Sequence, residues 1–173
     1  MEQKALRTLS ISSLALLAAL VAVLPAHAQE TKTPCPNMAP PDQYRMERDA
    51  EIALARSAAP ASISQDAEVM LLGRRDYETT VKGKNGFVCM VLRSWTAGTD
   101  DPELWNPKVR SPICFNPPAV RSYLPQVIMK TKAILAGQSK HQMAEEIRVA
   151  LDKKELPSQE PGAMCYMMSK QGS

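Results

Sequence analysis

Histidine and aromatic residues are scarce in this sequence, and the shortage narrows the chemistry open to it. Of 173 residues two are histidine, and aromatic side chains make up 5%. His27 lies in a segment that we expect to be removed, so the folded chain would keep His141 alone. Ser-His-Asp and Cys-His sites need a histidine, and zinc sites commonly use several. We therefore predict no catalytic residues, no metal site and no cofactor.

A hydrophobic run long enough to cross a membrane is also lacking. The longest apolar run covers Leu14 to Leu24 and is closed by Pro25, whereas a spanning helix needs about 20 apolar residues. Basic residues precede this run, and the small-x-small sequence 26–28 follows it, which is typical of a secretory signal peptide. We predict a signal peptide over residues 1–28 and an exported protein, periplasmic or extracellular, with no transmembrane segment in the mature chain.

Charge of one sign does not accumulate anywhere in the chain. The formal net charge is +3, from 21 basic and 18 acidic residues that are scattered along the sequence. Binding to nucleic acid calls for a concentrated basic surface. We therefore predict no nucleic-acid partner, and expect an unknown small-molecule or envelope partner.

The four cysteines show no Cys-x-x-Cys spacing, which argues against a thioredoxin-like redox site or a zinc ribbon. All four, Cys35, Cys89, Cys114 and Cys165, lie in the part predicted to be exported, where an even number of cysteines indicates disulfides. Three pairings are possible. We favour Cys89 with Cys114, because both sit in short strand-like apolar runs. Cys35 with Cys165 would follow by elimination.

The first half of the expected domain contains one helix and three strands. Residues 29–41 are polar and proline-rich and predict a flexible lead-in to a single domain over residues 42–173. Asp42 can cap a helix that runs to about Ser57. Its charged residues are expected on a solvated face: Arg45, Glu47, Arg48, Asp49, Glu51 and Arg56.

Strands are expected at residues 67–73, 77–81 and 87–95, joined by two tight turns into an antiparallel meander. The second turn is predicted from the sequence Lys-Gly-Lys-Asn-Gly at 82–86. The third strand is apolar at both parities from Phe87 to Leu92, so we expect both of its faces to be covered.

The second half is expected to be mainly helical. A long loop over residues 96–112 leads to a short extended piece at 113–115. Asn116 then caps a helix that reaches Leu135 with a break near Pro125. Ser139 and Gln142 form a capping box for the next helix, and residues 163–168 predict a last strand. The fold class is therefore α+β, a small and mainly antiparallel sheet (the meander plus a C-terminal strand) packed with helices.

One loop has a composition that suits ligand binding. Two tryptophans flank three carboxylates in it, and we predict a ligand site formed by Trp95, Asp100, Asp101, Glu103 and Trp105. Aromatic faces beside carboxylates can bind a sugar, a cation or a peptide. The alternative interpretation is that both rings cover the core while the acids face water.

Several short strings in the chain resemble those of a group of uncharacterised exported bacterial proteins. The strings are Asn85-Gly86-Phe87-Val88-Cys89, Trp105-Asn106-Pro107, Ile113-Cys114-Phe115-Asn116-Pro117 and Met167-Met168-Ser169-Lys170. The likeness runs from about Glu51 onward and implies export but no activity. Longer members continue past this point into a His-rich apolar segment, which implies that this chain is a shortened form lacking a strand and any ligands carried there.

These observations favour a non-catalytic exported binding or envelope-associated protein. The alternative is a hydrolase-like enzyme that acts on an envelope component through the carboxylates of Asp100, Asp101 or Glu103. The sequence leaves open whether the chain is an enzyme, what it binds, its oligomeric state, its disulfide connectivity and its completeness at the C-terminus.

Overall fold

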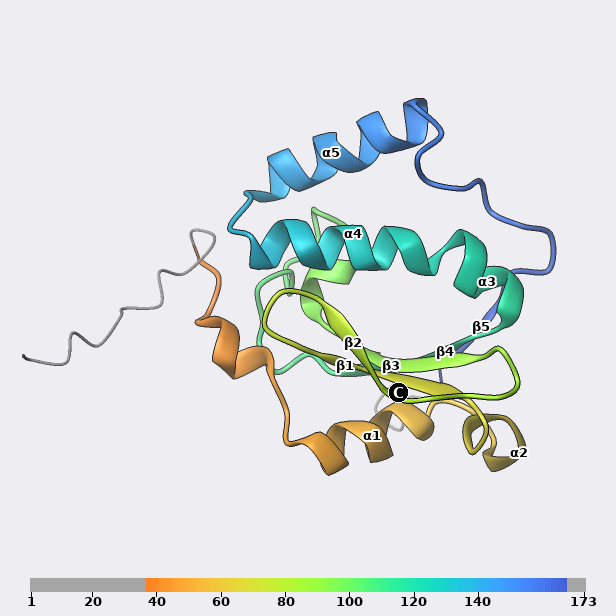
Figure 1. The fold of residues 1–173 in the computed structure, drawn as a ribbon. Helices are drawn as coiled ribbons and strands as arrows, with labels where there is room; N and C mark the ends of the chain where they lie inside the picture. Colours follow the sequence, from red (N-terminus) through yellow and green to blue (C-terminus); the bar gives the residue numbers. More distant parts are fainter. Residues whose placement is uncertain (1–36, 168–173) are drawn as a thin grey trace, which may run out of the picture. The chain divides into compact units, whose positions relative to one another are not determined.

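The computed structural model describes residues 37–167 of the chain. The predicted signal peptide, most of the predicted lead-in and Cys35 lie outside the described residues. Residues 37–167 form a five-stranded mixed, mostly antiparallel sheet with helices packed against it (Figure 1). The predicted α+β class is confirmed.

The sheet has the strand order β2-β1-β3-β4-β5, in which neighbouring strands are hydrogen-bonded. The strands are β1 (Glu68–Leu72), β2 (Tyr77–Val81), β3 (Val88–Leu92), β4 (Ser111–Phe115) and β5 (Cys165–Tyr166). Among the strands of residues 37–167, only β1 and β3 pair in parallel. All five residues of the central strand β3 are buried, which confirms that both faces of this apolar segment are covered.

The predicted meander is wrong, because β3 pairs with β1 and not with β2. The connection from β2 to β3 crosses over the start of β1. There the Lys84 amide donates to the Asp66 carbonyl over 2.7 Å, and the Glu68 amide donates to the Phe87 carbonyl over 2.9 Å. A Cβ on Gly83 would lie 2.2 Å from the Glu68 nitrogen. The glycine-rich sequence that resembles a hairpin turn thus lets one backbone pass closely over another.

The new position of β3 has a simple physical reason. In a meander this all-apolar strand would lie beside β2, whose residues Glu78 and Thr79 are exposed. In the observed order β3 lies between β1 and β4, two strands with more buried residues. The most apolar segment thereby takes the place where most of its surface is removed from water.

Helices cover both faces of the sheet (Figure 1). On one face lie α1 (Arg48–Arg56) and α2 (Ala61–Ser64); on the other lie α3 (Pro117–Ser122) and α4 (Leu124–Leu135), with α5 (Lys140–Asp152) packed on α4. Short 3₁₀ helices occur at η1 (Pro41–Tyr44) and η2 (Ser94–Thr96). Alternate residues of β3 serve the two cores: Cys89 and Val91 pack towards α1, and Met90 packs towards α4.

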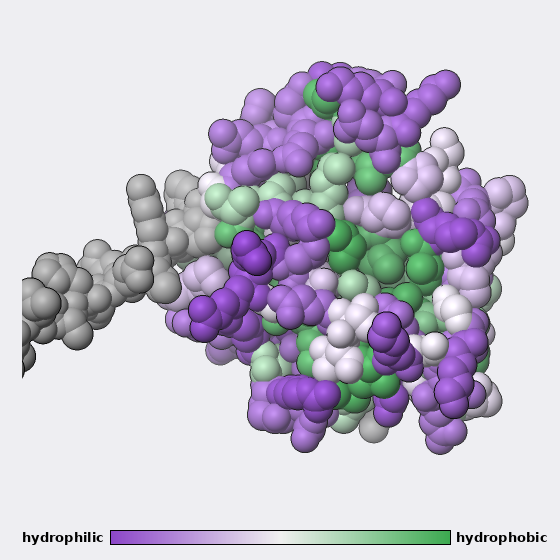
Figure 2. All heavy atoms as spheres, viewed as in Figure 1, coloured by the Kyte–Doolittle hydropathy of each residue, from purple (hydrophilic) through white to green (hydrophobic). Residues whose placement is uncertain are grey.

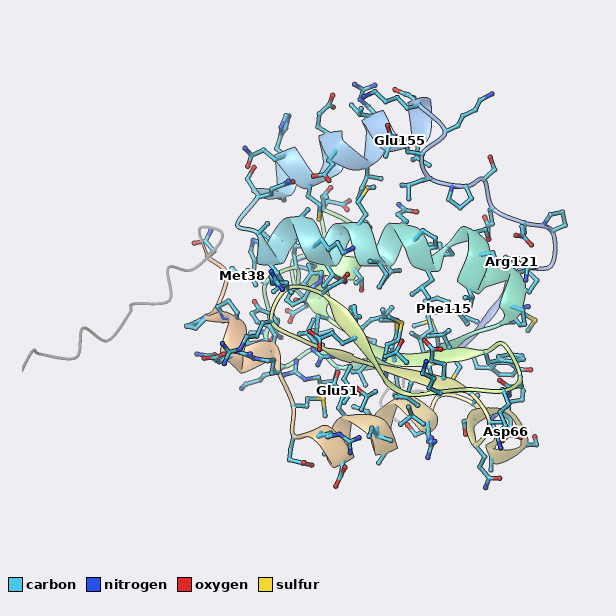
Figure 3. All side chains as sticks on the ribbon, in the orientation of Figure 1. Met38, Glu51, Asp66, Phe115, Arg121 and Glu155 are labelled. Carbon is cyan, nitrogen blue, oxygen red and sulfur yellow. A yellow bond between two sulfur atoms is a disulfide. The ribbon has the colours of Figure 1, made fainter. Side chains whose placement is uncertain are left out.

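The first helix is shorter than predicted. It begins at Arg48, where the Glu47 side chain accepts a hydrogen bond of 2.9 Å from the Ala50 amide, and not at Asp42, which lies in η1. Its charged side is not entirely solvated, because Glu51 is 2% exposed. Figure 3 shows Glu51 between α1 and the sheet.

The helix caps and the helix break that were predicted for the second half are confirmed. Asn116 caps α3 by accepting from the Ala119 amide, the helix breaks at Tyr123 before Pro125, and Ser139 and Gln142 form both hydrogen bonds of a capping box. The last strand is shorter than predicted and covers only Cys165–Tyr166; residue 168 lies outside the described range.

A disulfide joins Cys89 to Cys114, which lie directly opposite each other on β3 and β4. Both residues are 0% exposed. This confirms the favoured pairing. Cys165 is exposed on β5, and its predicted bond to Cys35 stays a prediction because Cys35 is not described.

Candidate functional site

Trp95, the first residue of the predicted ligand loop, belongs to the core. It is 0% exposed, and its indole Nε1 donates a hydrogen bond of 3.1 Å to Thr131 Oγ1 on α4. Its ring lies 4.7 Å from the ring of Tyr44, measured between centroids. The indole therefore connects η2, α4 and η1 and faces no surface in this structure.

Three of the other four residues of that loop, Asp101, Glu103 and Trp105, form hydrogen bonds within it or with η1. The half-buried Trp105 accepts a hydrogen bond of 2.6 Å on its carbonyl from the Tyr44 hydroxyl. Asp101 accepts one of 2.8 Å from the Glu103 amide, and the Glu103 carboxylate accepts one from the Asn106 side-chain amide. Asp100 is exposed. The structure does not bring the Trp95 ring to these carboxylates, and ligand binding by the loop stays a prediction.

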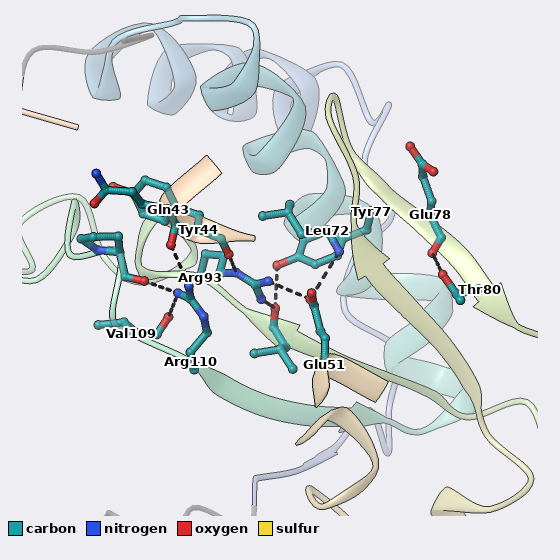
Figure 4. Close-up of polar contacts among 12 residues, drawn as sticks. Gln43, Tyr44, Glu51, Leu72, Tyr77, Glu78, Thr80, Arg93, Val109 and Arg110 are labelled. Atoms are coloured by element: carbon teal, nitrogen blue, oxygen red, sulfur yellow. Dashed lines mark hydrogen bonds and ion pairs between the residues drawn. The ribbon is translucent and has the colours of Figure 1, made fainter. Parts of the chain in front are cut away.

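A buried ion pair lies near this loop (Figure 4). Arg93 Nη2 is 2.7 Å from Glu51 Oε1, and both side chains are almost completely buried. Arg93 Nε donates to the Tyr44 carbonyl over 2.6 Å, and Glu51 Oε1 also accepts from the Leu72 amide at 3.3 Å. A buried charge is tolerated when it is paired and hydrogen-bonded, and this pair joins η1, α1 and β1 to the end of β3.

Two further polar residues surround the pair. Arg110 donates 2.9 Å and 3.0 Å hydrogen bonds to the carbonyls of Gln43 and Val109. Burial lowers its guanidinium pKa, and the charge of Arg93 lowers it further. The Tyr77 hydroxyl donates to the Val91 carbonyl over 2.8 Å, and burial raises its pKa. All of these contacts join parts of the chain to one another, so we interpret the network as structural.

An open surface with two hollows lies along α3 and α4. Three apolar side chains there recur every four residues, Val120, Leu124 and Ile128, and we call them the α4 ridge. On one side of the ridge is a groove of about 480 Å³, bounded by α4, by α5 and by the turn after α5. Its lining residues are Val120, Leu124, Pro125, Ile128, Met129, Lys132, Glu146, Glu155 and Leu156. We call this the upper groove.

A second groove, of about 370 Å³, lies on the sheet side of the ridge and shares Val120 and Leu124 with the first. Its other lining residues are Glu68, Met70, Gly83, Gly86, Phe87 and Val88. We call this the lower groove. Figure 2 shows hydrophobic residues gathered over α4, between more hydrophilic surfaces at α5 and at the loops of the sheet. The ridge and its two grooves therefore form one continuous apolar surface.

Three charged residues line the upper groove, Lys132, Glu146 and Glu155. Lys132 Nζ lies 3.1 Å from a carboxylate oxygen of Asp76. Glu146 accepts a hydrogen bond of 2.7 Å from the Gln138 side chain. Glu155 lies just beyond the end of α5 (Figure 3). Within residues 37–167, neither Glu146 nor Glu155 forms a salt bridge. The lining of the upper groove thus consists of apolar side chains, one lysine that is paired with Asp76, and two carboxylates that form no salt bridge within residues 37–167.

Other kinds of site find little support in the described part of the chain. No group of three or more His, Cys, Asp or Glu side chains in residues 37–167 is placed to hold a metal ion. His141 is exposed in the first turn of α5. No helix in the same range is both long and apolar enough to span a membrane.

Comparison with protein-family models, with curated proteins and with solved structures found no match. The resemblance to exported bacterial proteins therefore stays a prediction. The α4 ridge was not predicted, because apolar residues at helical spacing do not by themselves show which side of a helix stays uncovered. The signal that could have indicated it is the spacing of Val120, Leu124 and Ile128, with Pro125 and Met129 beside them.

Proposed function

We propose that this chain is an exported, non-catalytic binding protein, and that the α4 ridge with its two grooves is its binding surface. The observation that carries the proposal is a continuous apolar surface with hollows of about 480 Å³ and 370 Å³. Contiguous apolar surface that stays open to water commonly marks a binding site.

Two features support export. The sequence begins with a basic start, an apolar run and a small-x-small site, as secretory signals do. The folded part contains a disulfide between Cys89 and Cys114, and disulfides persist mainly in oxidising compartments.

The chemistry of the grooves supports binding without turnover. The upper groove is lined mostly by hydrocarbon, and Lys132, its one lining cation, is engaged by Asp76. A nucleophile paired with a base, the arrangement that covalent catalysis needs, is not found among the described lining residues. Such a surface can remove apolar groups of a partner from water and leave them chemically unchanged.

The proposal is tested with an environment-sensitive apolar dye and one pair of variants. Ile128→Lys puts a charge on the ridge, whereas Leu151→Lys makes the same change at a side chain that is 47% exposed and outside both grooves. We expect the first variant to weaken dye binding about tenfold or more and the second to change it less than about twofold, since burying a charge costs far more than leaving it in water.

Thermal unfolding of both variants checks that each is folded before binding is compared. Equal dye binding by the two folded variants would contradict the proposed surface. Turnover of an envelope-derived substrate by the purified mature chain would contradict the non-catalytic part of the proposal.

A further inference from the structure

We propose that the partner of this surface is a cationic amphipathic helix, that is, a polypeptide segment with one apolar face bordered by Lys or Arg. This inference rests on the proposed function, because it names the chemistry of what the α4 ridge binds. Its two parts, the helical shape and the positive charge, come from different observations.

The helical shape follows from the ridge and its flanking grooves. Val120 lies in α3, and Leu124 and Ile128 lie in α4, so the three recur every four residues across the break at Tyr123. Rows of side chains four residues apart form the ridges by which helices pack into the grooves of a neighbouring helix. Here Val120 and Ile128 are partly exposed, Leu124 between them is 8% exposed, and a groove lies on each side of the three. A partner helix laid along it would place side chains at positions i, i+3 or i+4, and i+7 into the two grooves.

The positive charge follows from the carboxylates along the grooves. Glu146 and Glu155 line the upper groove without a salt bridge, while the charge of Lys132 is already matched by Asp76. The charged residue lining the lower groove is Glu68, which accepts a hydrogen bond of 2.7 Å from the Thr79 hydroxyl. The lining of both grooves therefore carries unmatched negative charge and no unmatched cation among the described residues.

The charges that line the two grooves indicate which side of the partner helix carries its cations. Two carboxylates without a salt bridge, Glu146 and Glu155, line the upper groove, whereas one carboxylate, Glu68, lines the lower groove, where the exposed Lys82 and Lys84 are sequence neighbours of the lining residue Gly83. We place the cations of the partner helix on its α5 side, facing Glu146 and Glu155. An acyl chain that ends in a carboxylate would bring like charges together at that edge, which disfavours it.

The test uses two synthetic peptides with the same leucine face at i, i+3, i+4 and i+7 spacing. One carries lysine at the flanking positions and the other carries glutamate. We expect the lysine peptide to bind the mature protein about tenfold more tightly at low salt, and this preference to shrink as salt is added.

A pair of double variants locates the charges. Glu146→Gln with Glu155→Gln removes the carboxylates of the upper groove. Glu145→Gln with Asp152→Asn makes the same change in net charge on α5, outside the groove lining. The first double variant is expected to weaken binding of the lysine peptide about 3- to 10-fold and the second less than about 2-fold.

The outcomes separate this inference from the proposed function. The cationic partner would be overturned by either of two results. One is equal binding of both peptides, and the other is no effect of the Glu146 and Glu155 changes while Ile128→Lys still abolishes binding. Both results would leave the proposed binding surface intact. If Ile128→Lys changes neither the binding of the two peptides nor that of the dye, the proposed surface itself is overturned. Failure of both peptides where the dye binds would overturn the helical partner alone.

Discussion

One buried side chain, that of Glu51, is expected to contribute strongly to the stability of this domain. Its sequence neighbours place it on a charged helix side, yet its carboxylate is buried against Arg93 and the Leu72 amide. Removing one partner of a buried ion pair leaves the other charge without compensation, which costs about 3–5 kcal/mol. The pair is therefore a point where conservative changes have large effects.

We predict that Glu51→Gln lowers the free energy of unfolding by about 3–5 kcal/mol, because Arg93 then keeps its charge in a dry site. Urea unfolding measures the loss. The double variant Glu51→Leu with Arg93→Met, in which both charges are replaced by hydrocarbon, should recover much of the lost stability. A loss below about 1 kcal/mol for Glu51→Gln would mean that water reaches the guanidinium.

Tyr77 gives a prediction for alkaline pH. Burial raises the pKa of its hydroxyl above the ordinary value of 10.0, so above that pH the unfolded chain releases this proton while the folded chain keeps it. The unfolded state then binds fewer protons, and stability falls as pH rises. Unfolding measured from pH 9 to 11 should show the fall. Tyr77→Phe, which loses a hydrogen bond worth about 1 kcal/mol, should start less stable and show a smaller slope.

At the scale of elements, local chemistry accounts for the features that could be predicted from the sequence. The Asn116 cap, the break before Pro125 and the box of Ser139 and Gln142 each depend on residues within four positions of one another. The connection formed by residues 82–87 crosses β1, and this crossing depends on which strand lies at the centre of the sheet. Lys-Gly-Lys-Asn-Gly fits both a hairpin and a crossing, so local sequence could not separate them.

Two glycine substitutions test the crossing. Gly83→Ala would put a Cβ 2.2 Å from the Glu68 nitrogen, a backbone atom that cannot easily move. We expect it to destabilise the domain by about 3 kcal/mol, the upper end of the usual cost of overpacking. Gly162→Ala has no atom within 4 Å but a φ of +77°, and should cost about 1 kcal/mol through backbone strain alone. Chemical denaturation of both variants provides the comparison, and equal losses would contradict the close crossing.

The surface that we propose for binding could not be predicted for a related reason. The apolar spacing of residues 117–135 is that of a buried helix, and the side of α4 left open depends on where α5 packs. The tryptophan loop illustrates the opposite case. Its composition suits a ligand site, but the core takes Trp95 because a large ring gains more from burial than from exposure.

At the scale of the whole molecule, the Cys89–Cys114 disulfide raises the free energy of unfolding. It links residues 25 positions apart, and closing a loop of that length stabilises a fold by about 3.5 kcal/mol in the chain-entropy model. Because both cysteines are fully buried under α1, a reductant reaches them only when that helix unpacks.

We predict that the folded protein keeps this bond in millimolar dithiothreitol at neutral pH and loses it once urea unfolds the chain. Cys89→Ala with Cys114→Ala should lower the unfolding free energy by about 3–4 kcal/mol. Mass spectrometry after alkylation follows the bond, and urea unfolding follows the stability. Rapid reduction of the native protein would contradict the tight packing of α1 over the sulfurs.

The same disulfide closes residues 89–114 into a covalent loop, a circuit that contains η2 and the whole tryptophan loop. A protease that cuts the exposed Pro102–Glu103 stretch would open the circuit without releasing either piece. The nicked molecule should migrate as one band on a non-reducing gel and as two after reduction. After such a cut the five strands within residues 37–167 would stay covalently joined.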